Sequence, residues 1–249
     1  MRLFGTEPAS ENAAPTGTRK RALGEALVAS IGITVWIGVA SIFFPESIQG
    51  AAISGAFLFA TWFCVWRYDD ETVGAHGLLL GGLVVPGALD TTRILGSLRR
   101  ASLLALAVSL LFFPLYGAGW HAYWKPEGPF QFQPMTLDFG SFVLAQIFLV
   151  ALPEEAFYRG FLLTRFSNVF PARFSLLGGR VGIAVAITSL VFALGHIVPP
   201  NSPSRLTVFF PALVFSWLRL RSGGIGAGVL FHAMCNVFSH VLASGYAKH

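Results

Sequence analysis

Long apolar runs separated by short polar stretches dominate the chain from residue 22 onward. A run of about 20 mostly apolar residues is typical of a helix that crosses a bilayer. We expect about seven transmembrane helices in one bundle, at Ala22–Phe44, Gln49–Trp66, Ala101–Tyr116, Phe139–Leu163, Val181–Val198, Leu206–Leu220 and Ile225–Ala243. The pattern therefore predicts an all-α, polytopic membrane protein.

One further apolar run, Ala75–Ala88, contains several glycines and Pro86. It is too short and too broken for a spanning helix, so we expect a re-entrant or interfacial segment. Three units follow from the pattern: a disordered tail at 1–21, N-terminal membrane helices with an outer loop at 22–138, and a C-terminal unit at 139–245, which carries the polar residues discussed below.

Composition supports the membrane assignment. Only 12% of the residues are charged, against about 25% in an average soluble domain, and the mean hydropathy is +0.66. The net charge of +5 does not indicate nucleic-acid binding, because the cations cluster at the ends of the apolar runs. Cys64 and Cys235 lie within apolar runs without metal-binding spacing, and we expect both to be buried small hydrophobes.

The basic residues also predict an orientation, since cytoplasmic loops of membrane proteins are enriched in Lys and Arg. Alternate loops carry most of them: Arg19, Lys20, Arg21, Arg67, Arg93, Arg99, Arg100, Arg165, Arg173, Arg180, Arg219 and Arg221. The opposite loops hold few, such as Lys125 and Arg205. We therefore expect a multi-pass protein of the inner (plasma) membrane with a cytoplasmic N-terminus and an external C-terminus.

Two adjacent carboxylates, Glu154 and Glu155, interrupt the fourth apolar run. A charged side chain at the bilayer centre costs ~2.5–3.5 kcal/mol or more, so an ionisable residue there indicates a functional site. On a helix, Glu155 and Arg159 share a face, whereas Glu154 is rotated by about 100°. We expect Glu155 to pair with Arg159 and Glu154 to point elsewhere, while Pro153 kinks the helix and frees a backbone carbonyl.

Two later runs also carry polar groups: Phe192 precedes His196, and His232 precedes Asn236 at helical spacing. Taken singly, each polar residue could be an interhelical hydrogen-bonding contact. Together, a glutamate and a histidine can activate water as a general base, and a second histidine with an amide can stabilise an oxyanion. This combination suits peptide-bond hydrolysis inside a membrane.

Other hydrolytic sites lack their sequence signals. The chain contains no His-Glu-x-x-His, no Gly-x-Ser-Gly and no Gly-Asp, and its four Asp residues lie outside the predicted spans. Glutamate and histidine can both ligate zinc, so zinc remains a chemical alternative, although no cofactor is favoured. The non-proteolytic alternatives are a transporter or proton relay, and a non-catalytic membrane scaffold.

The three polar groups resemble the motifs of the CPBP intramembrane proteases, which include CAAX prenyl endopeptidases and Abi bacteriocin-immunity proteins. The family's Glu-Glu-x-x-x-Arg, Phe-x-x-x-His and His-x-x-x-Asn motifs are matched by Glu154, Glu155 and Arg159, by Phe192 and His196, and by His232 and Asn236. The resemblance covers about residues 139–242. It implies a glutamate-dependent endopeptidase that needs no metal and acts on a membrane-anchored protein or peptide.

The resemblance also implies roles for these residues. Glu154 would act with His196 on water, while His232 and Asn236 would stabilise the oxyanion. Glu155, Arg159 and Phe192 would support the site. A myxosortase-like branch that removes C-terminal sorting anchors is one specialisation that the resemblance suggests.

The predicted topology places Glu154 ~20 Å along its helix, far from His196 near the outer end of another helix. We therefore expect the fourth helix to be longer, reaching Asn168, with its first turns projecting beyond the membrane. In that arrangement we expect the two side chains to share a water, and a separation of more than about 8 Å without a water path would count against it.

Overall fold

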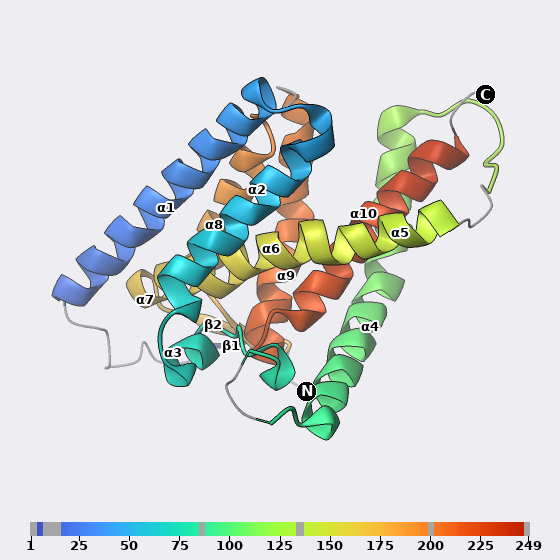
Figure 1. Ribbon diagram of the computed structural model, residues 1–249. Coiled ribbons are helices and arrows are strands. Elements are labelled where there is room, and N and C mark those ends of the chain that lie inside the picture. The colour runs from blue at the N-terminus through green and yellow to red at the C-terminus, as the bar shows by residue number, and fades with distance from the viewer. Residues whose placement is uncertain (1–3, 7–15, 85–87, 133–136, 199–201, 247–249) are drawn as a thin grey trace.

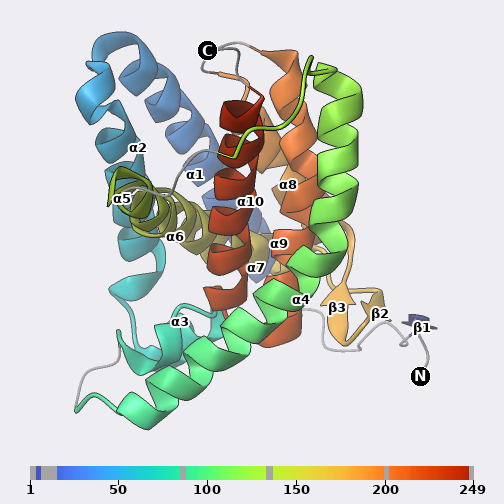
Figure 2. The same cartoon turned by 90° about the vertical axis from the view of Figure 1, so that its right-hand side faces the viewer.

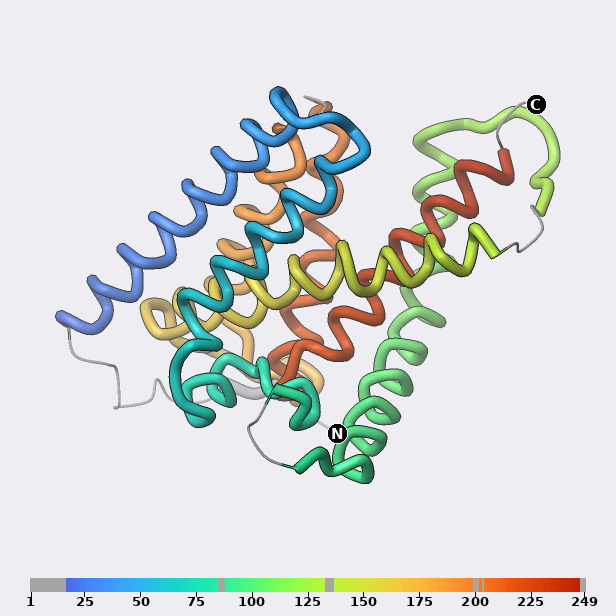
Figure 3. The backbone as a smooth tube through the Cα atoms, viewed as in Figure 1, coloured from blue at the N-terminus to red at the C-terminus, as the bar shows by residue number. Residues whose placement is uncertain are grey.

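The protein is a bundle of α-helices, described by a computed structural model over residues 4–6, 16–84, 88–132, 137–198 and 202–246 (Figures 1 and 3). The α-helices are α1 (Thr16–Phe43), α2 (Glu46–Thr61), α3 (Asp70–Ala75), α4 (Thr91–Trp124), α5 (Leu137–Ala145), α6 (Leu152–Glu155), α7 (Leu163–Val169), α8 (Ile183–Gly195), α9 (Phe209–Ser222) and α10 (Gly226–Gly245). The predicted all-α class is confirmed.

Within the described residues, five helices are long and apolar enough to cross a membrane: Gly17–Phe43, Glu46–Trp66, Thr91–Trp124, Leu137–Val169 and Gly226–Gly245. The protein is therefore a multi-pass membrane protein. The other two predicted spans correspond to α8 and α9, of 13 and 14 residues. At 1.5 Å per residue each is about 20 Å long, shorter than a hydrocarbon core of about 30 Å, so the count of seven is not confirmed.

Two helices, α4 and α1, begin before the apolar runs that predicted them, because capping or helix-forming residues precede those runs. α4 begins ten residues before the predicted Ala101, because the Asp90 side chain accepts a hydrogen bond from the Arg93 amide at 3.0 Å and caps the helix. It ends where Lys125 adopts a left-handed conformation. α1 begins at Thr16, six residues before the predicted span, while residues 7–15 of the predicted tail lie outside the described residues.

A small antiparallel sheet joins the N-terminal segment to the connection between α7 and α8. Its strands are β1 (Phe4–Thr6), β2 (Phe174–Leu176) and β3 (Gly179–Val181), in the order β1-β2-β3. The Trp217 indole donates a hydrogen bond to the Leu176 carbonyl at 2.9 Å, which fixes the sheet against α9. The sheet is an appendage to the helical bundle.

The two glutamates lie on a long helix whose regular α-helical turns are interrupted twice. Two π-helical segments, Gln146–Ala151 and Ala156–Leu162, join α5, α6 and α7 into one helix from Leu137 to Val169. It reaches past Asn168, as expected. It also lies across its neighbours: it runs across the bundle in Figure 1, whereas Figure 2 views α5 and α6 nearly end-on. Because the long helix crosses α8 and α10 at an angle, the position of a residue along it does not set its depth along those two helices. Glu154 can therefore contact residues of both.

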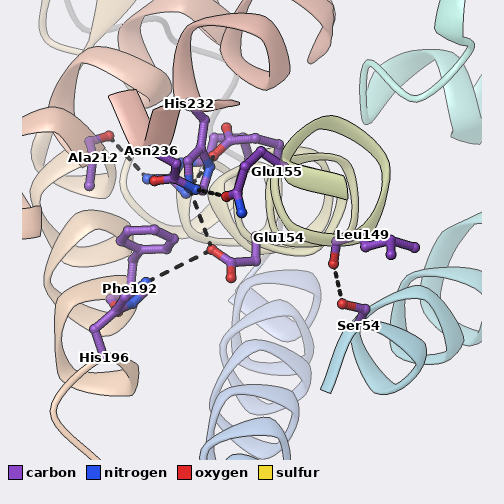
Figure 4. A network of polar contacts seen from close by, with 11 residues as sticks. Ser54, Leu149, Glu154, Glu155, Phe192, His196, Ala212, His232 and Asn236 are labelled. Atoms are coloured by element: carbon purple, nitrogen blue, oxygen red, sulfur yellow. Dashed lines mark hydrogen bonds and ion pairs between the residues drawn. The ribbon is translucent and has the colours of Figure 1, made fainter. Parts of the chain in front are cut away.

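Irregular turns in this helix surround Pro153. Proline has no amide hydrogen and crowds the carbonyl four residues earlier, which is that of Leu149. The Ser54 hydroxyl of α2 donates a hydrogen bond to this carbonyl, so the neighbouring helix satisfies the group that the sequence predicted to be freed (Figure 4). π-Helical turns occur frequently at functional sites, and here they flank the two glutamates.

The segment Ala75–Ala88 forms no spanning helix in its described part. α3 ends at Ala75, and a 3₁₀ turn follows at Leu80–Gly82, while Pro86 lies outside the described residues. Leu78 is fully buried and packs on Gly160 of the long helix. Leu78 therefore anchors the connection in the core. The re-entrant or interfacial placement of the segment stays a prediction.

Gly160→Ala is expected to destabilise the protein by about 1–3 kcal/mol, because overpacking a well-filled contact costs that much. A Cβ at residue 160 would lie 2.6 Å from Leu78 Cδ2, closer than real Cβ contacts. The measurement is the melting temperature of the full chain in detergent. Gly55→Ala is the matched control in a membrane helix, since its Cβ would meet nothing within 4 Å. Equal melting temperatures for the two variants would contradict the packing argument.

The loops predicted to share one side of the membrane lie together. The start of α1, the α2–α3 connection, the start of α4 and the end of α9 all lie in the lower half of Figure 1. Direct contacts join them: Arg165 Nε lies 3.0 Å from Glu25 Oε2, and Arg219 Nη2 donates to the Ala75 carbonyl at 3.0 Å. We call this region the basic end. That it faces the cytoplasm stays a prediction.

Candidate active site

The predicted polar residues converge where the long helix meets α8 and α10 (Figure 4). Glu154 points between the two histidines: its Oε2 atom lies 4.0 Å from His196 Nε2 and 3.8 Å from His232 Nε2. The expected proximity of Glu154 and His196 is thus present. Three helices far apart in sequence supply three ionisable groups to one point.

Glu155 has a different environment from its neighbour. Its Oε1 atom lies 3.0 Å from Arg159 Nη1 and 3.0 Å from His232 Nδ1, and both partners in the Glu155–Arg159 ion pair are fully buried. The predicted pairing one turn along the helix is confirmed. α10 can approach this carboxylate because Gly228 has no side chain: a Cβ there would lie 3.0 Å from Glu155 Oε2.

Aromatic rings enclose the Arg159 guanidinium. Its Cζ atom lies 4.3 Å from the ring centre of Phe192 and 5.0 Å from that of Phe215, and Nη2 donates to the Ala212 carbonyl at 3.3 Å. Cation–π contacts of a desolvated guanidinium stabilise by about 2 kcal/mol or more. Phe192 therefore supports the buried ion pair. Phe215, which also stacks on His232 with ring centres 4.7 Å apart, was not singled out from the sequence.

Hydrogen bonds fix how each imidazole is presented. His196 Nδ1 lies 2.8 Å from the Phe192 carbonyl, which can only accept, so Nδ1 carries the hydrogen. In the neutral ring the Nε2 lone pair then faces Glu154. His232 donates from Nδ1 to the Glu155 carboxylate and presents Nε2 to the same side of the site.

Glu154 is the open member of the cluster. Its Oε2 atom makes no hydrogen bond to any described residue, and its side chain is 14% exposed, against none for Glu155. The 4.0 Å separation from His196 Nε2 is too long for a direct hydrogen bond. Both atoms can act as acceptors, so a water that donates one hydrogen to each satisfies both.

Asn236 lies on the same helix as His232 but has a different partner. Its amide donates to Gln146 Oε1 at 2.9 Å. Gln146 belongs to the long helix, two turns before Glu154, and was missed in the sequence. The signal was present, since an uncharged amide within an apolar membrane run also needs a partner. One Asn236 N–H is committed to Gln146, which leaves the second N–H for another acceptor.

The zinc alternative can be compared with the arrangement of possible ligands. In the described part of the chain, no group of three or more His, Cys, Asp and Glu side chains is arranged to hold a metal ion. Glu155 is also committed to Arg159 and to His232 Nδ1. We therefore derive no chemical step through a metal.

Comparison with known proteins identifies the region that carries this site. Residues 136–238 match the family model described as "Type II CAAX prenyl endopeptidase Rce1-like". All seven motif residues lie within the match, and the resemblance seen in the sequence is confirmed for this region, whereas the myxosortase-like branch is not.

A curated relative is similar over a shorter stretch. It is an Escherichia coli protein described as "Uncharacterized 24.3 kDa protein", 36% identical over 90 residues. The match covers 36% of this chain and 38% of that protein. No solved structure matches the chain.

Proposed function

Residues 136–238 match the Rce1-like type II CAAX prenyl endopeptidases, and from this premise we propose that the protein is an intramembrane endopeptidase of the glutamate-dependent kind. The observation that carries the proposal is the position of Glu154 Oε2, which faces two imidazole nitrogens at 3.8–4.0 Å and makes no hydrogen bond to a described residue. A buried acceptor without a donor is costly, and a nucleophilic water supplies that donor.

In the proposed reaction, water lies between Glu154 and His196 and attacks the carbonyl carbon of the scissile peptide. Glu154 accepts the proton as general base and returns it to the leaving amine. The Phe192 carbonyl holds the His196 ring so that Nε2, rather than Nδ1, faces the water. The tetrahedral oxyanion forms on the opposite side of the carbonyl, where His232 and the free N–H of Asn236 donate to it.

Charge balance supports the role of His232. Its Nδ1 already donates to Glu155, so Nε2 can donate only when the ring is an imidazolium. With both glutamates ionised, the charges on Arg159 and an imidazolium at His232 bring the cluster to zero. Glu155 thus has two functions in this scheme: it neutralises Arg159 and provides the counter-ion for the oxyanion donor.

The proposed substrate is a peptide bond of a membrane-anchored protein or peptide. Glu154 and His196 are partly accessible, at 14% and 25% of their side-chain surface, whereas the support residues behind them are buried. We propose an inner-membrane location with the N-terminus in the cytoplasm. Removal of a C-terminal sorting anchor is the narrower form of the proposal.

A proton relay across the first helices would need polar groups along α1, α2 and α4, where the described residues offer few buried ones. Buried Ser30, Thr61 and Ser109 each donate to the carbonyl four residues earlier in their own helix, at 2.7–2.8 Å. These hydroxyls are satisfied locally. They do not connect the site to either end of the first helices.

His196→Ala tests the proposed function. We expect membranes containing the wild-type chain to accumulate new protein termini, detected by mass spectrometry, and the variant to produce them at least about 100-fold more slowly, since general base catalysis contributes 10²–10⁴-fold. His240→Ala on α10 is the matched control, because residue 240 is exposed and its ring contacts Phe142, with ring centres 4.5 Å apart. Normal processing by a folded His196→Ala protein would show that the proposal is wrong.

A further inference from the structure

A polar cavity lies at the basic end, between α7, α9 and the end of α3. It has a volume of about 230 Å³ and reaches Arg159 but neither glutamate. Its polar lining consists of Arg159, Thr164, Ser167, Asn168 and Arg219. The proposed reaction gives this cavity no part.

Arg219 is the unusual member of this lining. Its side chain is 92% buried, and its guanidinium donates to the Ala75 carbonyl at 3.0 Å, but no described carboxylate forms an ion pair with it. Its Nε has no hydrogen-bond partner among the described residues, and neither has the Nε of Arg159. An uncompensated buried cation costs several kcal/mol, so the cavity lacks an anion.

Glu25, an acidic side chain of the basic end, does not supply that anion. Glu25 is already shared between Arg165 and Arg21, at 3.0 and 2.9 Å. The other polar groups of the cavity are able to donate: Ser167 and Asn168 make no side-chain hydrogen bond to a described residue. Guanidinium, hydroxyl and amide donors around an unbalanced charge form a site for a phosphate or a similar oxyanion.

We propose that this cavity binds the phosphate group of an anionic phospholipid headgroup. Basic pockets between membrane helices on the cytoplasmic side bind such headgroups, and this cavity lies where the basic loops of the chain meet. Its volume is below the ~300–1,000 Å³ of a small-molecule pocket, which suits a headgroup better than a peptide. Inorganic phosphate has the same chemistry, so the experiment must separate the two sources.

Binding can be measured on the full chain in detergent, by native mass spectrometry and by the rise in melting temperature. Three additions are compared: phosphatidylglycerol, phosphatidylcholine and inorganic phosphate. We expect retained phosphatidylglycerol adducts and a raised melting temperature for the wild type, with little effect of the other two. Arg219→Gln should weaken phosphatidylglycerol binding by about 10–100-fold, the loss expected for one hydrogen bond to a charged group.

Arg221→Gln is the matched control, since it removes one exposed charge two residues away that does not line the cavity. It should keep the wild-type affinity. Equal weakening by both variants would overturn the site in favour of general surface attraction, and so would equal binding of the two lipids. Binding of inorganic phosphate without phosphatidylglycerol would overturn the headgroup as the ligand.

A second variant covers the case in which Arg219→Gln fails to fold, because Arg219 also holds the Ala75 carbonyl. Ser167→Ala combined with Asn168→Ala changes only half-buried and exposed positions of the same cavity. This double variant should fold and bind phosphatidylglycerol about 10-fold more weakly, and wild-type affinity would overturn the proposal. None of these measurements depends on peptide cleavage, so their failure and the failure of the proposed protease function can be distinguished.

Discussion

Glu154→Gln is expected to reduce peptide hydrolysis by about 10²–10⁴-fold while the protein remains folded. Glutamine keeps the size of the side chain but cannot accept a proton from water. The fold should be unaffected, because Glu154 Oε2 makes no hydrogen bond to the described residues and the side chain is partly exposed. The measurements are the rate at which new termini appear in membranes and the melting temperature of the purified variant.

Comparison of the hydrolysis rate with the melting temperature separates loss of the general base from loss of the fold. A folded Glu154→Gln protein with an unchanged rate would rule out Glu154 as the base.

Glu155→Gln is expected to destabilise the protein by about 3–5 kcal/mol, the cost of removing one partner from a buried ion pair. Arg159 would remain enclosed by aromatic rings, with only the Ala212 carbonyl and a neutral amide as acceptors. His232 would also lose the carboxylate that holds its Nδ1. The expected result is a lower melting temperature in detergent, accompanied by a loss of hydrolysis.

The matched control is the neighbouring substitution, because Glu154→Gln and Glu155→Gln change the same chemical group one residue apart. The first should affect the rate alone, and the second both rate and stability. If the two variants melt at the same temperature, the buried pair does not stabilise the fold as argued. If Glu155→Gln alone abolishes hydrolysis, the assignment of the two glutamates must be exchanged.

The sequence predicted the features that depend on local periodicity. The positions of the apolar runs match α1, α2, α4, the long helix and α10, and the Glu155–Arg159 pair follows directly from helical spacing. The role of Pro153 was predictable for the same reason, since a proline always leaves the carbonyl four residues earlier without its usual donor. These contacts join residues within one turn of each other.

Features that depend on how helices far apart in sequence cross each other could not be predicted from local periodicity. The inclination of the long helix, which brings Glu154 to His196, is set by its packing against α2 and α10. Projection of its first turns beyond the membrane was inferred from the predicted depths of Glu154 and His196, and an inclined helix makes that assumption unnecessary for the contact. The pairing of Gln146 with Asn236 and of Phe215 with His232 became identifiable only when three helices were placed together.

The unequal burial of the two glutamates has an evolutionary consequence. One base change can convert a glutamate codon to a glutamine codon, and at residue 154 that change would remove the proposed general base. It would not disturb the buried Glu155–Arg159 pair, which with His232 and the Ala212 carbonyl joins three helices. Under the proposed mechanism, a chain with this scaffold can therefore lose hydrolysis in a single step and still accumulate in the membrane as a folded protein. A member of such a lineage that retained only binding would keep Glu155 and Arg159, and residue 154 would be free to vary.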